Sequence, residues 1–309
     1  MIEKGFKKIG FIGLGVMGSR MCERLLLLEN DLFVNDISEE AMLRLVDKGA
    51  IRAVSPEALA EQCDIILTSL PNSAIVENVV FGESGLLGGV REGAILIELS
   101  SSTPSTTERV GSALQKKGAY MIDAPVSRGA GAAANGTLSI MVGGDVEVID
   151  SCRFILDQLG TDILHTGKLG TGHAMKALNN LLNATNLIAA CEGLVIAHKE
   201  GVKPENFTEA INNSSGASHI TTVRFPKYFL NRAFNSNFTL GLMYKDCSIA
   251  LEMAQKMGTP MLFTSLTQQV YAMGMSKGMA NEDNTRILEV IEDVLGHSVK
   301  EEVEMDSVS

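Results

Sequence analysis

Three glycines near the N-terminus are spaced so that a phosphate group could touch the backbone. In KKIGFIGLGVMGSRM, Gly13, Gly15 and Gly18 follow an apolar run and lead into a helix-like segment. Glycine destabilises the interior of strands and helices, so three of them here need a local reason. In a dinucleotide-binding turn the first glycine makes the bend, the second admits the pyrophosphate, and the third lets helix and strand pack closely. The helix N-terminus then offers free N–H groups to the phosphates.

A carboxylate stands at the distance from this loop that suits a ribose contact. Asp36 ends the apolar run DLFVND, about twenty residues past the glycines, where an acidic side chain holds the adenosine ribose hydroxyls. A carboxylate repels a ribose phosphate, and no arginine follows Asp36 directly, so the sequence favours NAD over NADP. A glycine-rich turn that binds no nucleotide is the alternative. The predicted cofactor contacts here are Gly13, Leu14, Gly15, Val16, Met17, Gly18, Asn35 and Asp36.

A lysine lies on a polar stripe of an otherwise apolar helix in LGTGHAMKALNNLL. Residues three and four positions apart lie on the same face of a helix, so this stripe contains Lys176, Asn179, Asn180 and Asn183. Burial lowers the pKa of a lysine, and such an amine can exchange a proton with a hydroxyl group. The alternative is a lysine that extends to solvent or pairs with a glutamate. His173, three residues before the lysine, is predicted to lie at the surface or at the edge of a site.

Alternating strand-like and helix-like runs must position these residues. The strand-like runs are KIGFIG, DLFVND, IILTSL, AILIEL and AYMIDAP, with helix-like segments at 19–29, 39–48, 74–80 and 106–117. This alternation predicts a parallel sheet with helices on both faces, an α/β fold. TLSIMVGG and DILHTG are further strand-like runs, with a helix predicted over 146–159 between them. After His165 helical periodicity dominates to about Gly296.

The change of pattern predicts three segments. Residues 1–168 form an NAD-binding domain, residues 169–300 an all-helical domain for substrate and oligomerisation, and residues 301–309 an acidic tail. Two turns follow strands of the first domain, where open α/β sheets bind ligands. They contain Leu70, Pro71 and Asn72 in one case and Ser101 in the other. Taken alone, each turn favours an ordinary connection over a ligand-binding loop.

Composition limits the partners and the compartment. The formal net charge is −11 and no basic stripe occurs, which argues against nucleic acid. The apolar segment 172–197 contains four asparagines, so a buried helix of a soluble protein fits better than a membrane span. Five cysteines without a CxxC pair indicate free thiols, and no signal-like segment precedes the first strand, so we expect a cytoplasmic protein. The histidines and cysteines lack metal-ligand spacing, and no metal site is predicted.

Five blocks together resemble the β-hydroxyacid dehydrogenases, the family of 3-hydroxyisobutyrate dehydrogenase and tartronate semialdehyde reductase. The blocks are GFIGLGVMGSRM, SLPNSAIVENVVFGESGLL, DAPVSRGAGAAANGTLSIMVGG, GTGHAMKALNNLL and LGLMYKDCSIALEMA. Their order and spacing cover nearly the whole chain. The resemblance implies a Rossmann-like doubly wound domain joined by a long helix to an all-α domain. It also implies a homodimer or homotetramer built through the helical part, a small anionic substrate and a nicotinamide cofactor.

The resemblance also implies roles for individual residues. Lys176 matches the catalytic lysine, and Asn179 and Asn180 match residues that orient the lysine and the substrate. Ser127 matches the contact to the substrate carboxylate, and we expect the Gly129 backbone to help anchor the same group. The positions that match cofactor contacts are Leu70, Pro71, Ser101 and Lys245.

Arg128 departs from the family pattern. The family usually has glycine at this position, in DAPVSGG, where the chain has DAPVSRG. A similar arginine occurs in the sulfolactaldehyde reductases of the family, since a guanidinium suits an oxyanion. The alternative is an arginine that faces solvent or a partner subunit. We therefore expect a dehydrogenase for a small 3-hydroxy acid or its semialdehyde, with Lys176 as general acid–base and Arg128 as a candidate substrate contact.

Other functions stay open at this point. A 3-sulfolactaldehyde reductase and a 2-(hydroxymethyl)glutarate dehydrogenase use the same scaffold for other substrates. In imine reductases the lysine position is typically changed, so Lys176 argues against that activity. An NAD-binding scaffold without catalysis belongs to another class, and its relatives lose the lysine.

Overall fold

The chain is described here by a computed structural model that covers residues 8–300. It divides into two compact units between Lys176 and Ala177. Residues 1–7 and the predicted acidic tail, 301–309, lie outside the described residues. Compactness does not assign roles, so the division into a cofactor domain and a substrate domain stays a prediction.

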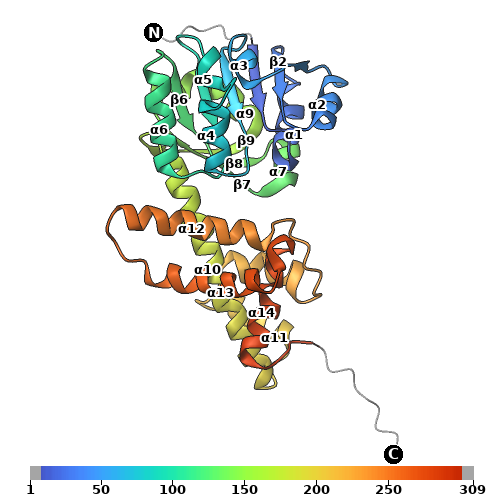
Figure 1. Cartoon of the computed structure of the whole chain (residues 1–309). Helices are drawn as coiled ribbons and strands as arrows, with labels where there is room; N and C mark the ends of the chain where they lie inside the picture. Colours follow the sequence, from blue (N-terminus) through green and yellow to red (C-terminus); the bar gives the residue numbers. More distant parts are fainter. Residues whose placement is uncertain (1–7, 301–309) are drawn as a thin grey trace, which may run out of the picture. The chain divides into compact units, whose positions relative to one another are not determined.

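The first unit contains a nine-stranded sheet (Figure 1). Its strands are β1 (Lys8–Ile12), β2 (Asp31–Asn35), β3 (Ile51–Arg52), β4 (Ile65–Thr68), β5 (Ile95–Glu98), β6 (Tyr120–Asp123), β7 (Val126–Ser127), β8 (Leu138–Gly143) and β9 (Gly160–Gly167). The order is β3-β2-β1-β4-β5-β6-β8-β7, and β9 pairs with β8. The strands from β3 to β6 are parallel. The strand order reverses between β1 and β4, and ligands bind outside the carboxyl ends of strands at such a point.

The far side of the sheet is not parallel, contrary to the simplest form of the sequence prediction. β8 runs antiparallel to β6 and to β7, whereas β9 is parallel to β8. The chain reverses through β7 and the short helix α7 (Gly129–Asn135). It then returns through α8 (Val146–Ser151) and α9 (Arg153–Leu159), an ordinary crossover. The predicted helix over 146–159 is therefore two helices that meet at Cys152.

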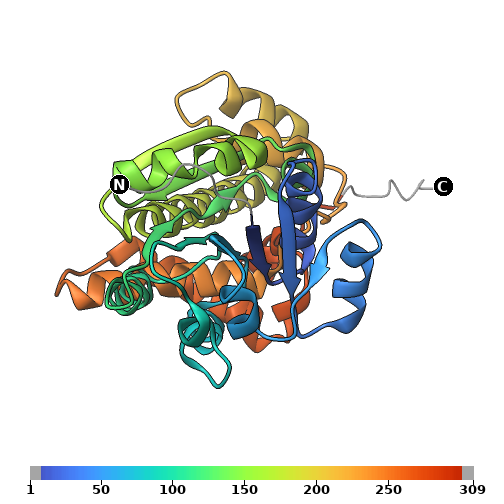
Figure 2. The ribbon, with the colours of Figure 1, turned by 90° about the horizontal axis from the view of Figure 1, so that it is seen from above.

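Helices cover both faces of this sheet (Figure 2). Successive strand residues face opposite sides: Ile65 and Leu67 pack in one apolar cluster, and Ile66 packs in another. The first cluster joins the sheet to α1 (Val16–Leu25), α2 (Glu39–Val46), α8 and α9. The second joins it to α3 (Pro56–Ala60), α4 (Ser73–Phe81), α5 (Leu86–Gly89) and α6 (Pro104–Gln115). The predicted doubly wound α/β fold is confirmed.

The second unit is helical, as predicted. It begins within α10 (Thr171–Lys199), a helix of 29 residues that carries Lys176 in its second turn. The other elements are α11 (Pro204–Asn212), the π-helix η1 (Ile220–Phe229), α12 (Leu240–Lys256), α13 (Leu262–Ser276), the 3-10 helices η2 (Met279–Asn281) and η3 (Asn284–Arg286), and α14 (Ile287–Leu295). Their shared core includes Leu187, Phe225 and Tyr271.

Candidate functional site

The three loop glycines meet three different surroundings. Gly13 has a φ of 96°, and a Cβ there would lie 2.3 Å from the carbonyl oxygen of Ser69, after β4. A Cβ on Gly18 would lie 1.9 Å from the carbonyl oxygen of Gly13. A Cβ on Gly15 would meet no atom within 4 Å. Gly13 therefore makes the bend, Gly18 lets α1 pack on β1, and Gly15 leaves open space over the backbone, which is the arrangement that a pyrophosphate requires.

The N-terminus of α1 has no side-chain cap. Gly15 is its N-cap residue, and the first turn contains no acidic side chain. The N–H groups of Val16, Met17 and Gly18 have no partner inside the helix, as in the first turn of any helix. By contrast, Ser38, Ser55, Asn72 and Thr103 cap α2, α3, α4 and α6 with side-chain oxygens. The end of the helix beside the glycines is thus the one open to an anion among these five.

Asp36 lies directly beside the glycine loop. Its two carboxylate oxygens accept the N–H groups of Leu14, at 2.5 Å, and of Ser38, at 2.7 Å. Each oxygen keeps further acceptor capacity for hydroxyl groups. Among residues 8–300, no lysine, arginine or histidine forms an ion pair with Asp36. Asn35, just before it, instead donates its side-chain amide to the carbonyl of Ala53.

The predicted contacts after β4 and β5 lie at the same sheet edge. Leu70 is next to Gly13, and its N–H donates to the hydroxyl of Ser100 at 2.8 Å. Ser101 is partly buried and Pro71 is exposed. The side-chain oxygen of Asn72 caps α4 by accepting the N–H of Ile75 at 3.0 Å. Asn72 therefore has a structural role that the sequence pattern did not indicate.

Lys176 and Ser127 meet at this edge of the sheet. The Nζ atom of Lys176 donates to Oγ of Ser127 at 3.1 Å, and both side chains are partly buried. Ser127 follows β6 by four residues, and Lys176 lies in the second turn of α10. A primary amine and a hydroxyl group that share a hydrogen bond can bind an oxygen atom of a substrate and exchange a proton with it.

His173 is buried, so the prediction that it lies at the surface or at a site edge is wrong. Its relative exposure is 1%, and Glu98 and Asp123 beside it are at 0%. Its Nδ1 lies 2.7 Å from Oγ1 of Thr107 on α6, and its Nε2 lies 3.0 Å from Oε2 of Glu98 at the end of β5. The helical pattern could not show that this side chain points between the sheet and α6.

These three buried groups shift each other's pKa values. Burial alone would lower the pKa of His173, but the hydrogen bond and charge of Glu98, with the charge of Asp123, raise it. Burial would raise the pKa of Glu98, but the charge of His173 and its hydrogen bond lower it. For Asp123 burial dominates and raises the pKa. Glu98 and His173 therefore each favour the charged form of the other.

Arg128 is held by neighbouring residues of its own unit. Its guanidinium forms an ion pair with Asp162, on β9, and a long hydrogen bond of 3.3 Å to the carbonyl of Thr137. Its backbone φ is 85°, in the left-handed region that favours glycine. Gly129, next to it, is exposed with a φ of 72°. Pairing with Asp162 places the charge of Arg128 in an exposed salt bridge, where ion pairs contribute little stability.

The second unit contains a polar chain that starts on α10. Asn179 donates to Oδ1 of Asn180 at 3.1 Å, and Asn180 donates to Oδ2 of Asp246 at 2.5 Å. The ammonium of Lys245 lies 3.0 Å from the other oxygen of Asp246. Asp246 is buried and was missed as a site candidate, although the KD pair in the sequence pointed to it. It fixes the Asn180 side chain one helical turn after Lys176.

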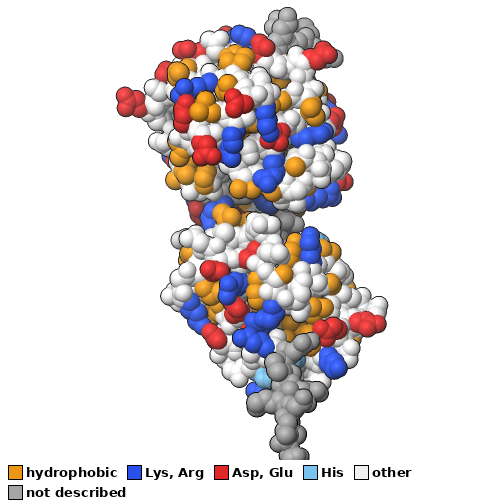
Figure 3. Space-filling view, turned by 90° about the vertical axis from the view of Figure 1, so that its right-hand side faces the viewer, with side chains coloured by type: hydrophobic (Ala, Val, Ile, Leu, Met, Phe, Trp, Pro, Cys, Tyr) orange, Lys and Arg blue, Asp and Glu red, His pale blue; other side chains and the backbone are white. Residues whose placement is uncertain are grey.

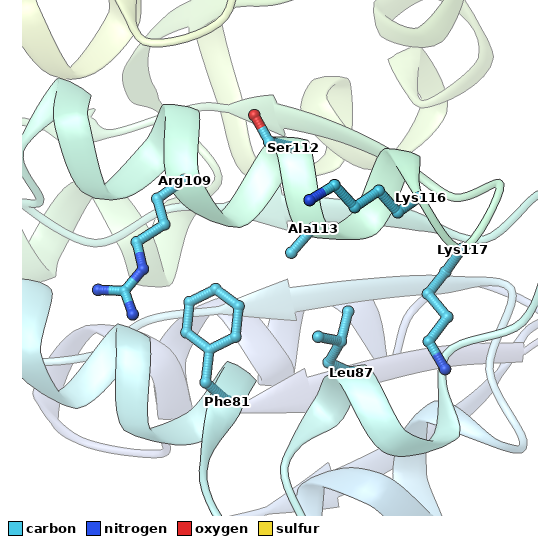
Figure 4. Close-up of a pocket in the computed structure, with 7 residues that line it drawn as sticks. All are labelled: Phe81, Leu87, Arg109, Ser112, Ala113, Lys116 and Lys117. Atoms are coloured by element: carbon cyan, nitrogen blue, oxygen red, sulfur yellow. The ribbon is translucent and has the colours of Figure 1, made fainter.

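A cavity of about 490 Å³ lies elsewhere on the first unit, against α6 (Figure 4). Its lining residues are Phe81, Leu87, Arg109, Ser112, Ala113, Lys116 and Lys117, and none is a predicted site residue. Arg109 stacks over the ring of Phe81 and pairs with Glu77 at 2.8 Å. On the face shown in Figure 3, basic and acidic side chains are interspersed.

Two family models match the chain. The NAD-binding domain of 6-phosphogluconate dehydrogenase matches residues 8–167, and the NAD-binding domain of NADP-dependent 3-hydroxyisobutyrate dehydrogenase matches residues 170–291. The second match includes all of α10, which by length and apolar composition could otherwise be taken for a membrane span. Core helices of folded domains can have the same length and apolar composition, so we assign α10 to this folded domain.

Similar proteins cover nearly the full chain. The chain is 37% identical over 298 residues to 2-(hydroxymethyl)glutarate dehydrogenase of Eubacterium barkeri, with 96% of this chain and 99% of that protein covered. It is 35% identical to 3-sulfolactaldehyde reductase of Escherichia coli, with 94% and 98% covered. A solved structure of Mycobacterium tuberculosis 3-hydroxyisobutyrate dehydrogenase with L-serine matches with a TM-score of 0.86 at 26% identity, covering 93% of this chain and 99% of that one.

We expect alanine at two loop glycines to affect two different properties, stability in one case and cofactor affinity in the other. Gly18→Ala places a Cβ 1.9 Å from a carbonyl oxygen, so it should lower the free energy of unfolding by about 1–3 kcal/mol. Gly15→Ala meets no atom within 4 Å, so it should change that free energy by less than about 0.5 kcal/mol and weaken NADH binding. Urea unfolding and NADH fluorescence measure the two effects. Unchanged NADH affinity in Gly15→Ala would contradict the assignment of the loop.

The buried ion pair predicts a pH dependence of stability. Because the pKa of His173 is raised in the folded state, its stabilisation is complete below about pH 6.5, the ordinary histidine pKa. That stabilisation is lost as the pH rises through the folded-state value. The free energy of unfolding of the wild type, minus that of the Glu98→Gln/His173→Gln double variant, should therefore fall as pH rises above about 6.5. Urea unfolding across this range measures it, and a difference that grows with pH would show that His173 is not held as a cation.

Proposed function

Because the chain belongs to the β-hydroxyacid dehydrogenases, a family of NAD(P)-dependent oxidoreductases, we propose that it transfers hydride between NAD and the hydroxyl-bearing carbon of a small 3-hydroxy acid. Lys176 is the general acid–base of this proposal. The observation that carries it is the 3.1 Å hydrogen bond from Lys176 to Ser127. Both residues lie at the carboxyl edge of the sheet, the edge at which the glycine loop follows β1.

The residues of the glycine loop suit the nicotinamide cofactor that the family uses. Gly15 leaves the backbone open to a pyrophosphate, and the uncapped first turn of α1 offers N–H donors. In this proposal Asp36 accepts the ribose hydroxyls. Its carboxylate, which pairs with no basic side chain among residues 8–300, disfavours a phosphate there, so we propose NAD rather than NADP. Leu70, Pro71, Ser101 and Lys245 are proposed as further contacts. When bound, the nicotinamide ring supplies the hydride acceptor for oxidation and the donor for reduction.

The chain's own residues move the proton. In oxidation, neutral Lys176 accepts the proton of the substrate hydroxyl; in reduction, its ammonium donates a proton to the forming alkoxide oxygen. General acid–base help of this kind contributes about a hundredfold to ten-thousandfold. The hydroxyl of Ser127 and the backbone N–H of Gly129 hold the substrate carboxylate in this proposal. Asn180, fixed by Asp246, and Asn179 orient the substrate.

The substrate class is argued from the anion site. The similar proteins act, by their names, on 2-(hydroxymethyl)glutarate, 3-sulfolactaldehyde and 3-hydroxyisobutyrate. A sulfonate substrate would be favoured if Arg128 faced it, but Arg128 is paired with Asp162. We therefore place a carboxylate substrate first and a sulfonate second. A panel of the three substrates and tartronate semialdehyde, with NAD or NADH, separates these cases. NADH binding without turnover on any of them would favour the non-catalytic scaffold.

We also propose an oligomeric state and a compartment, which are supported by exposed apolar side chains and by the thiols. Leu262 and Phe263, at the start of α13, are 78% and 76% exposed. Such exposure supports a homodimer or homotetramer that buries them. All five cysteines are free and buried, which supports the proposal of a reducing, cytoplasmic compartment.

Lys176→Ala should lower kcat by at least about a hundredfold, because it removes the general acid–base. The affinity for NADH should change little, since Lys176 is not part of the glycine loop. Lys199→Ala is the matched control, because Lys199 is an exposed lysine in the last turn of the same helix. Steady-state turnover and NADH fluorescence make the comparison. Turnover of Lys176→Ala equal to that of Lys199→Ala would remove the basis of the proposed mechanism.

Asp36→Asn should change the choice of cofactor. Loss of a charged acceptor for ribose hydroxyls costs about 1.5–3 kcal/mol, so kcat/KM for NAD should fall by about tenfold to a hundredfold. The value for NADP should fall less or rise, because the repelling charge is gone. Asp31→Asn, an exposed residue at the other end of β2, is the control. Equal losses with NAD and NADP would argue against a ribose contact at Asp36.

A further inference from the structure

The buried group of Glu98, Asp123 and His173 connects three elements of the first unit. Glu98 ends β5, Asp123 ends β6, and His173 lies in the first turn of α10. Burying charged groups is costly unless each has partners. Such an arrangement inside a sheet edge needs a reason beyond packing, and neither the proposed hydride transfer nor the glycine loop uses these residues.

Both ring nitrogens of His173 face acceptors. The Thr107 hydroxyl donates to the carbonyl of Thr103 at 3.1 Å, so its oxygen accepts from Nδ1 of His173 at 2.7 Å. On the other side, Nε2 lies 3.0 Å from the carbonyl oxygen of Ser100 and 3.0 Å from Glu98. A ring that donates from both nitrogens is an imidazolium. The positive ring is therefore held between α6 and the end of β5.

Asp123 holds the backbone of the same turn. One of its oxygens accepts the N–H of Gly170 at 2.7 Å, and the other accepts the N–H of His173 at 2.8 Å. These donors at the N-terminus of α10 have no partners within the helix. Since both oxygens of Asp123 and both nitrogens of His173 are already engaged, this group leaves few atoms to bind a metal ion. No metal-binding cluster is found among residues 8–300.

The first turn of α10 is thus fixed at two levels. Asp123 holds the backbone of this turn at the end of β6. The His173 ring, which projects from the same turn, contacts Glu98 on β5 and Thr107 on α6. Lys176 follows His173 by three residues, so any rotation or shift of this turn moves the amine. Ser127, which accepts from that amine, follows Asp123 by four residues. The same segment therefore anchors the helix and presents the partner of Lys176.

We propose that Glu98, Asp123 and His173 are positioning residues for Lys176: a buried imidazolium between two carboxylates fixes the first turn of α10 on the sheet and so sets the place of the Lys176 amine. This inference rests on the proposed acid–base role of Lys176. A displacement of about 1 Å at a reacting group can cost about a hundredfold in rate. The charged group is suited to this task because its hydrogen bonds constrain the angle as well as the distance between the bonded groups.

The first test is the Glu98→Gln/His173→Gln double variant, which keeps hydrogen-bonding side chains and leaves no unpaired cation. We expect kcat to fall by about tenfold to a hundredfold, with the NADH dissociation constant unchanged within about twofold. Leu156→Ala is the stability control, because Leu156 is fully buried in the core between the sheet and α9. Measured well below its melting temperature, Leu156→Ala should keep the wild-type kcat. A folded double variant with wild-type kcat, or an equal loss in Leu156→Ala, overturns the proposal.

A second pair decides the question if the double variant does not fold. Thr107→Val removes the acceptor of Nδ1 of His173, whereas Thr107→Ser keeps it. We expect kcat to fall by about threefold to tenfold in Thr107→Val and to be restored in Thr107→Ser, with KM for the substrate changed less than kcat. Equal kcat in the two variants overturns the proposal. Lys176→Ala shows which of the two proposals has failed. If the acid–base role of Lys176 is wrong, this variant keeps full turnover; if only the positioning role of His173 is wrong, it still loses turnover.

Discussion

The carboxylate of Asp123 holds the start of α10, and the placement of Lys176 depends on that interaction. Asp123 ends β6, the last strand of the parallel part of the sheet, and accepts two N–H groups at the start of α10, at 2.7 and 2.8 Å. The same strand leads to Ser127, whose hydroxyl accepts from Lys176. An amine on a flexible side chain becomes a defined acid–base only when its backbone is fixed in this way. The buried pair of Glu98 and His173 adds a second fixed point.

The sheet supplies the common edge at which binding and proton transfer can meet. Parallel strands bring the ends of β1, β4, β5 and β6 to one side, and the order reverses next to the glycine loop. Gly13 bends against Ser69, and Gly18 lets the helix approach. The same packing leaves the backbone at Gly15 open and brings the carboxylate of Asp36 beside the loop. A dinucleotide-binding edge and a lysine-bearing helix are therefore two products of one doubly wound fold.

The sequence predicted features that depend on local pattern, and it missed those that depend on contacts across the fold. Alternation of apolar runs predicts the doubly wound class, but it does not encode strand direction, so the antiparallel β8 was not foreseen. α10 is apolar on several sides, so its pattern could not show that His173 points toward Glu98. The contacts of Asp123 with α10 and of Arg128 with Asp162 join residues far apart in sequence. Such pairings are set by tertiary packing, and local spacing does not predict them.

Chemical rescue of Lys176→Ala tests the central claim most directly. Small alkylamines added in solution should restore part of the lost turnover, because a free amine can take the place of the missing general acid–base. The restored rate should rise with amine concentration and vary with amine pKa. Tetramethylammonium in place of the alkylamine should restore no turnover, because it has no proton to exchange. Turnover of Lys176→Ala that is already close to the wild type and indifferent to added amine would contradict the claim that this amine transfers the proton.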